Sequence, residues 1–129
     1  MHLLPAERSH QRVIDGERVC QAITALDDPA AIRDRARRFA LLADPTRLTL
    51  LSCIHAAGPI SVSDLAAATG LADTTISQTL RHLRASQTVV AERDGRVMRY
   101  RLVDGAITEL LVGAGRAVAA PPARRRGAP

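Results

Sequence analysis

The stretch SVSDLAAATGLADTTISQTLRHL, residues 61–83, decides the fold, because it predicts two short helices joined by a glycine turn. Ser61 and Asp64 have the spacing of a capping box, which satisfies the first free amides of a helix. Gly70 allows the left-handed backbone that a sharp turn requires, and Asp73 is placed to cap the second helix. The pattern favours a helix-turn-helix; an ordinary helical hairpin with a solvated polar face is the plain alternative.

The second of these helices has two distinct faces. Its apolar residues Ile76, Leu80 and Leu83 recur at i, i+4 and i+7, which predicts a buried stripe. The opposite face carries hydroxyl, amide, guanidinium and imidazole groups, which suit phosphates and base edges in the major groove of DNA. The candidate DNA-contacting residues on this face are Thr74, Thr75, Ser77, Gln78, Arg81 and His82.

A β-hairpin is expected directly after this helix. Residues 88–93 are rich in β-formers, Asp94-Gly95 is a strong two-residue turn signal, and residues 96–102 alternate basic and apolar side chains. Val97 and Met98 break this alternation, which leaves the strand register open. Four arginines crowd this ribbon, as in the wing of a winged helix that grips phosphates or an adjoining minor groove. A solvated surface hairpin is the alternative. The candidate DNA contacts of the wing are Arg93, Arg96 and Arg99.

Three stretches together resemble the ArsR/SmtB family of small dimeric winged-helix repressors. They are LLADPTRLTLL (41–51), the helix-turn-helix with the residue after it (61–84), and RDGRVMRYRL (93–102), in matching order and spacing. The resemblance spans roughly residues 36–118. It implies a mainly α fold with a β-hairpin wing, dimeric through its N- and C-terminal helices. It also implies a homodimer that represses transcription at a double-stranded DNA operator and leaves it when an inducer, usually a metal ion, binds.

The bulk composition agrees with a small cytoplasmic DNA-binding protein. Hydrophobic residues make up 47% of the 129 residues and aromatic residues only 2%, so the core must be aliphatic. The formal net charge of +5 suits a nucleic-acid partner. All 18 basic residues are arginines, which favours bidentate phosphate and guanine contacts, although GC-rich codon bias explains the missing lysines better. No apolar run is long enough to span a membrane, and the N-terminus lacks the apolar core of a signal peptide.

The chain is expected to form one domain with two tails. A flexible arm covers residues 1–15, the winged helix-turn-helix and dimerisation domain covers 16–118, and a disordered basic tail with Arg124–Arg126 covers 119–129. Further helices are expected at 16–26, 30–43 and 46–57, and after Asp104, which is placed to cap the last of them.

The helix after Asp104 carries a sustained apolar stripe that needs a partner, so we expect a two-fold dimer; folding back within the monomer is the alternative. In such a dimer, two recognition helices lie about 34 Å apart, which predicts a partly palindromic operator.

The resemblance also implies where an inducer would bind. One family site combines an N-terminal cysteine with a cysteine and an aspartate before the recognition helix. Cys20 and Asp64 match two of these ligands, but Ser61 stands where the box has cysteine, and a hydroxyl is a far poorer soft-metal ligand than a thiolate. A second family site lies on the last helix, where Asp104 matches the first ligand. Alanine occupies its remaining positions, Ala106, Ala117 and Ala120.

Cys53 is the third candidate ligand beside Cys20 and Asp64. It could meet Cys20 to give a dithiol pair or a thiolate site for Zn, Ni, Co, Cd or arsenite. The same two cysteines could instead form a redox or persulfide switch, or pack as small hydrophobes in a ligand-independent regulator. Another alternative is a winged helix that contacts only other proteins, but this function would not explain the exposed arginines. An enzyme is not expected, because no nucleophile elbow, phosphate-binding loop or paired-carboxylate site is present.

Overall fold

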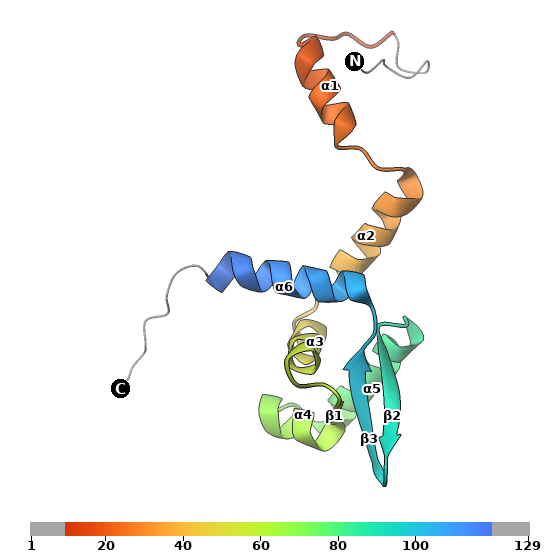
Figure 1. Ribbon diagram of the computed structural model, residues 1–129, viewed down its shortest axis with the longest axis vertical. Helices are drawn as coiled ribbons and strands as arrows, with labels where there is room; N and C mark the ends of the chain where they lie inside the picture. Colours follow the sequence, from red (N-terminus) through yellow and green to blue (C-terminus); the bar gives the residue numbers. More distant parts are fainter. Residues whose placement is uncertain (1–9, 120–129) are drawn as a thin grey trace, which may run out of the picture. The chain divides into compact units, whose positions relative to one another are not determined.

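The computed structural model describes residues 10–119 and divides the chain into two units, one up to Ala36 and one from Arg37 onward. The described residues leave out 1–9 of the predicted arm (1–15) and 120–129 of the predicted basic tail (119–129). Among the helices within 10–119, none combines the length and apolar character needed to cross a membrane. The elements, labelled in Figure 1, are α1 (Gly16–Thr24), α2 (Pro29–Leu42), α3 (Pro45–Ala57), β1 (Ile60–Ser61), α4 (Val62–Thr69), α5 (Asp73–Ala85), β2 (Val89–Asp94), β3 (Val97–Leu102) and α6 (Gly105–Ala119).

The first unit contains α1 and the start of α2. Asp15 caps α1, since its carboxylate accepts a hydrogen bond from the Arg18 amide at 3.2 Å. The helix ends at Thr24, two residues before the predicted end, and none of its residues is fully buried. Asp28 accepts from the Ala31 amide at 2.9 Å and so opens α2 directly before the proline at its first position.

The second unit is built around an aliphatic core, as the composition predicts. The buried residues come from every helix between α3 and α6 and from β2: Leu50, Leu51, Ile54, Leu65, Ile76, Leu80, Leu83, Val89, Ile107 and Leu111. The first half of α6 therefore packs on its own chain through Ile107 and Leu111. The sequence predicts that the whole apolar stripe of this helix packs against a partner, and that prediction is wrong for these two residues.

The helix-turn-helix forms as predicted, with one correction. The Ser61 hydroxyl accepts from the Asp64 amide at 3.1 Å, and Gly70 adopts a left-handed φ of 75° where α4 ends. Asp73 is not the cap of α5, because the extended residue before the helix is Ala72, which makes no side-chain cap bond. Asp73 lies instead in the first turn, where its charge still complements the positive end of the helix dipole.

The wing belongs to a three-stranded antiparallel sheet of order β1-β3-β2, and the short strand β1 was not predicted. The predicted hairpin turn is wrong by one residue. Asp94 pairs with Val97, so the two central residues are Gly95 and Arg96 rather than Asp94 and Gly95. Gly95 has a φ of 64° and Arg96 does not have a positive φ. Glycine at the first central position is typical of a type II′ turn, whose twist suits a hairpin.

A small hydrogen-bonded junction connects α5 to the wing. The Thr88 amide donates to the Leu83 carbonyl at 2.9 Å, and the Thr88 carbonyl accepts from the Val103 amide at 3.0 Å. The buried Thr88 hydroxyl lies 2.9 Å from the Ser86 hydroxyl, which is also 3.0 Å from the Leu83 carbonyl. These bonds hold the end of α5 against the start of β2.

Candidate nucleic-acid interface

The outward face of α5 is fixed by its buried face. Ile76, Leu80 and Leu83 are at most 1% exposed, so the side chains between them point away from the core. Thr75 is half-buried, and its carbonyl accepts from the Thr79 hydroxyl at 2.8 Å. The other candidate residues of this helix are all exposed: Thr74, Ser77, Gln78, Arg81 and His82. An exposed row of hydroxyl, amide, guanidinium and imidazole groups on one helix is suited to a DNA groove.

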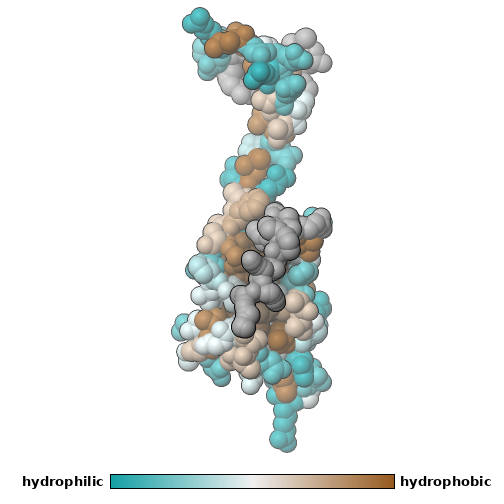
Figure 2. Space-filling view, turned by 90° about the vertical axis from the view of Figure 1, so that its left-hand side faces the viewer, coloured by the Kyte–Doolittle hydropathy of each residue, from teal (hydrophilic) through white to brown (hydrophobic). Residues whose placement is uncertain are grey.

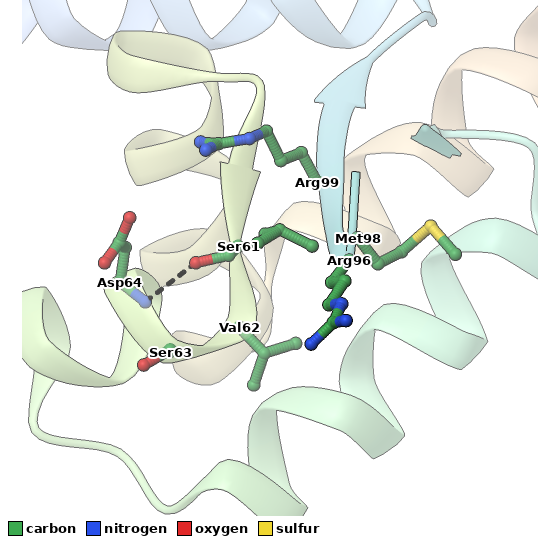
Figure 3. Close-up of a pocket in the computed structure, with 8 residues that line it drawn as sticks. Ser61, Val62, Ser63, Asp64, Arg96, Met98 and Arg99 are labelled. Atoms are coloured by element: carbon green, nitrogen blue, oxygen red, sulfur yellow. Dashed lines mark hydrogen bonds between the residues drawn. The ribbon is translucent and has the colours of Figure 1, made fainter. Parts of the chain in front are cut away.

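A groove of about 480 Å³ lies between the start of α4 and the wing, lined by residues 61–64 and 96–99. Figure 3 shows the Arg96 guanidinium directed toward this groove, whereas Met98 points away from it. Ser61 lies at the edge of the groove, but its hydroxyl already caps α4.

The wing arginines differ in their charge partners. Arg99 Nε lies 3.1 Å from an Asp94 carboxylate oxygen, and Arg101 Nε lies 2.6 Å from a Glu92 carboxylate oxygen. Within the described part of the chain, Arg93 and Arg96 form no ion pair, and both are exposed. Figure 2 shows the wing tip as a hydrophilic projection at the lower end of the view. The sequence supplied the arginines, but not their pairing, because pairing depends on the strand register.

The candidate inducer ligands lie in different units. Cys20 is half-buried on α1 in the first unit. Cys53 is half-buried against the core of the second unit, where Asp64 is exposed. Neither unit, so far as its residues are described, gathers three His, Cys, Asp or Glu side chains that could hold a metal ion. The donors of the second unit therefore do not fit a complete metal site by themselves.

Asp104, which matches a ligand of the second family site, has a structural role here. Its carboxylate accepts from Arg38 Nε at 3.0 Å and 3.3 Å, and from the Ala106 and Ile107 amides at 3.0 Å and 3.3 Å. The predicted cap of the last helix is thus confirmed. The Arg38 contact was not predicted, because the two residues lie 66 positions apart in the sequence.

The fold and the exposed face of α5 define a winged helix-turn-helix protein of the DNA-binding class. A family model described as a helix-turn-helix domain matches residues 42–92. The chain is 38% identical over 84 residues to the HTH-type transcriptional regulator NmtR of Mycobacterium tuberculosis. The aligned residues cover 65% of this chain and 69% of NmtR. It is 40% identical over 75 residues to the transcriptional repressor SmtB homolog of Synechocystis sp.. This alignment covers 58% of this chain and 56% of the relative.

A solved structure gives the same family. It is the homodimeric winged helix-turn-helix DNA-binding domain of Mb0332 from Mycobacterium bovis, described as a possible ArsR-family transcriptional regulator. The match has 31% identity and a TM-score of 0.58, and covers 74% of this chain and 88% of that one. The chain belongs to the ArsR/SmtB family of transcriptional regulators.

Proposed function

We propose that this chain is a cytoplasmic, homodimeric repressor that binds a partly palindromic operator and leaves it when a thiol-reactive or thiol-coordinating inducer binds. The exposed polar face of α5 is the observation that carries the proposal. Its groups can reach base edges in the major groove, while the buried stripe on the other face holds the helix outward. Gln78 and Arg81 are the strongest candidates for base contacts, because amide and guanidinium groups bind adenine and guanine in a bidentate manner.

Two features support a dimer. The relative Mb0332 is described as homodimeric. Several large apolar side chains of α2 and α3 are exposed in the single chain, including Phe39 at 52% and Leu48 at 40%. A two-fold dimer would bring two copies of α5 into successive major grooves on one side of the duplex.

The DNA-binding part of the proposal is tested on a duplex from the region upstream of the protein's own gene. We expect Gln78→Ala and Arg81→Ala each to cost about 1–3 kcal/mol of binding free energy and to relax sequence preference. Ser52→Ala/His55→Ala, on the exposed side of α3, is the matched control and should bind like the parent. Unchanged operator binding by Gln78→Ala/Arg81→Ala would remove the recognition-helix assignment.

The inducer is proposed to act on cysteine, since Cys20 and Cys53 are the only thiols of the chain and neither forms a disulfide bond in the structure. Zinc, nickel, cobalt, cadmium and arsenite are the probes, each titrated with and without Cys20→Ala. Stoichiometric binding that is lost in this variant would support metal or metalloid sensing. If none binds, mass spectrometry of the oxidised protein distinguishes a cysteine redox switch, with a Cys20–Cys53 bridge or a persulfide, from a repressor without an inducer.

A further inference from the structure

We propose that Glu92 and Asp94 restrain the wing. By pairing with Arg101 and Arg99, they limit how strongly the wing binds the phosphate backbone of any DNA sequence. The inference rests on the proposed function, because it concerns the same DNA-binding surface. Four arginines dominate the sequence of the wing, and the proposed restraint gives a role to the two acidic residues among them.

The strand register places all four side chains on one face of the ribbon. Glu92 lies directly opposite Arg99, and Asp94 lies opposite Val97, so these residues share a face. Arg101 is on the same face, two residues along β3 from Arg99. The other face packs against the core through Val89, Tyr100 and Leu102. The charged face therefore points away from the body of the second unit.

Each arginine bonds the acid diagonal to it rather than the residue opposite. Arg99 reaches past Glu92 to Asp94 at 3.1 Å, and Arg101 reaches past Val90 to Glu92 at 2.6 Å. Diagonal neighbours in an antiparallel pair are within reach of long side chains. The two pairs thus run in the same direction along the ribbon, which leaves the face close to electrically neutral.

The tip of the wing is different. Arg96 is a central residue of the turn, and Arg93 lies on β2 two residues before the turn begins. Both are exposed and, among the described residues, neither has an acidic partner. The cations that are ready to meet phosphates are therefore those at the tip, and the two arginines nearer the base are held by carboxylates.

The restraint weakens DNA binding without abolishing it, because both ion pairs are exposed to solvent. The Asp94 side chain is 72% exposed and the Arg101 side chain 47% exposed, and pairs of this kind are weak. If an arginine must break its ion pair before it contacts a phosphate, the association constant for DNA should fall by about 1.4- to 5-fold. Sequence-independent DNA binding depends almost entirely on phosphate neutralisation, so these residues should act on it directly.

The test is binding to a mixed-sequence duplex by fluorescence anisotropy at several salt concentrations. For each wing that contacts the duplex, Glu92→Gln/Asp94→Asn should raise the association constant about 2- to 30-fold. The slope of log K against log salt should steepen by about 0.9 for each freed arginine that reaches a phosphate. Glu17→Gln/Glu109→Gln removes the same charge from exposed sites on α1 and α6, and should have a much smaller effect.

A second comparison tests the pairing itself. When Arg99→Gln/Arg101→Gln is added to Glu92→Gln/Asp94→Asn, the gain in affinity should disappear. A gain that persists would mean that the acids act by repelling DNA directly, which overturns the proposed mechanism. A gain no larger than that of the control pair overturns it as well. The single variants Asp94→Asn and Glu92→Gln, checked by thermal unfolding, cover the case in which the double variant does not fold.

Failure of this inference is distinguishable from failure of the proposed function. If the parent protein binds its own upstream duplex but the acidic variants change nothing, only the restraint is wrong. If the parent protein binds no duplex even at low salt, the proposed function is wrong.

Discussion

Replacing Asp104 should separate two contributions to the stability of the second unit. This carboxylate caps α6 by accepting from the Ala106 and Ile107 amides, and it also pairs with Arg38 on α2. The two side chains are 28% and 16% exposed, so the pair is partly shielded from water. Both contacts lie at the start of the helix that we expect in the dimer interface.

The magnitude follows from these two contacts. Loss of an N-cap costs about 1 kcal/mol, within a range of about 0.5–2 kcal/mol. A partly buried pair should contribute about 1–2 kcal/mol, between an exposed pair and a fully buried one. Asp104→Ala should therefore lower the free energy of unfolding by about 2–3 kcal/mol. Asp104→Asn keeps a capping oxygen but loses the charge, so it should cost only about 1–2 kcal/mol.

The assay is urea unfolding at one fixed protein concentration, since dimerisation would couple stability to concentration. Asp104→Asn, Arg38→Gln and their combination form a double-mutant cycle, which isolates the pair from other contacts of Arg38. Glu109→Ala, on the exposed side of the same helix, is the control. A loss below about 0.5 kcal/mol for Asp104→Ala, or no coupling in the cycle, would refute the assignment.

Four further substitutions test the local structure by thermal or urea unfolding. Gly70→Ala should lower the free energy of unfolding by about 1–2 kcal/mol, because Gly70 has a left-handed φ. Gly113→Ala, inside α6 with open space around it, should raise the free energy of unfolding by about 0.5–1 kcal/mol. Equal effects of the two variants would contradict the turn geometry. Ser61→Ala should cost about 0.5–2 kcal/mol through the lost cap of α4, and a neutral result would show that this hydroxyl is not needed. Thr88→Val should cost about 0.5–1.5 kcal/mol, because it removes the hydroxyl that bonds Ser86 in the junction between α5 and β2; a more stable variant would contradict that role.

The helix-turn-helix could be predicted from the sequence because its signals are local. The cap at Ser61, the glycine at position 70 and the 3.6-residue period of the buried stripe each act within a few residues. Strand β1 could not be predicted, because its two residues become a strand only by pairing with Arg99 and Tyr100, about 40 positions away. The hairpin turn was misplaced for a similar reason: Asp94-Gly95 is a strong local signal, but the strand register decides which residues form the turn.

The candidate site was predictable to the same degree. Helical periodicity alone identifies which side chains of α5 face outward, and the structure exposes all of them except Thr75, which is half-buried. The pairing of Arg99 and Arg101 with acids depends on the register of the wing and was not visible in the sequence. The role of Asp104 shows the limit of resemblance, since a position matching a metal ligand is used here to cap a helix and hold Arg38.

Whether the exposed face of α5 reads DNA is tested most directly by a titration of two duplexes at physiological salt. One carries the sequence upstream of the protein's own gene, and the other has the same composition in scrambled order. We expect the parent protein to prefer the upstream duplex by about tenfold or more, and Gln78→Ala/Arg81→Ala to lose most of that preference. Equal binding of both duplexes by the parent protein, or no binding of either even at low ionic strength, would contradict this expectation.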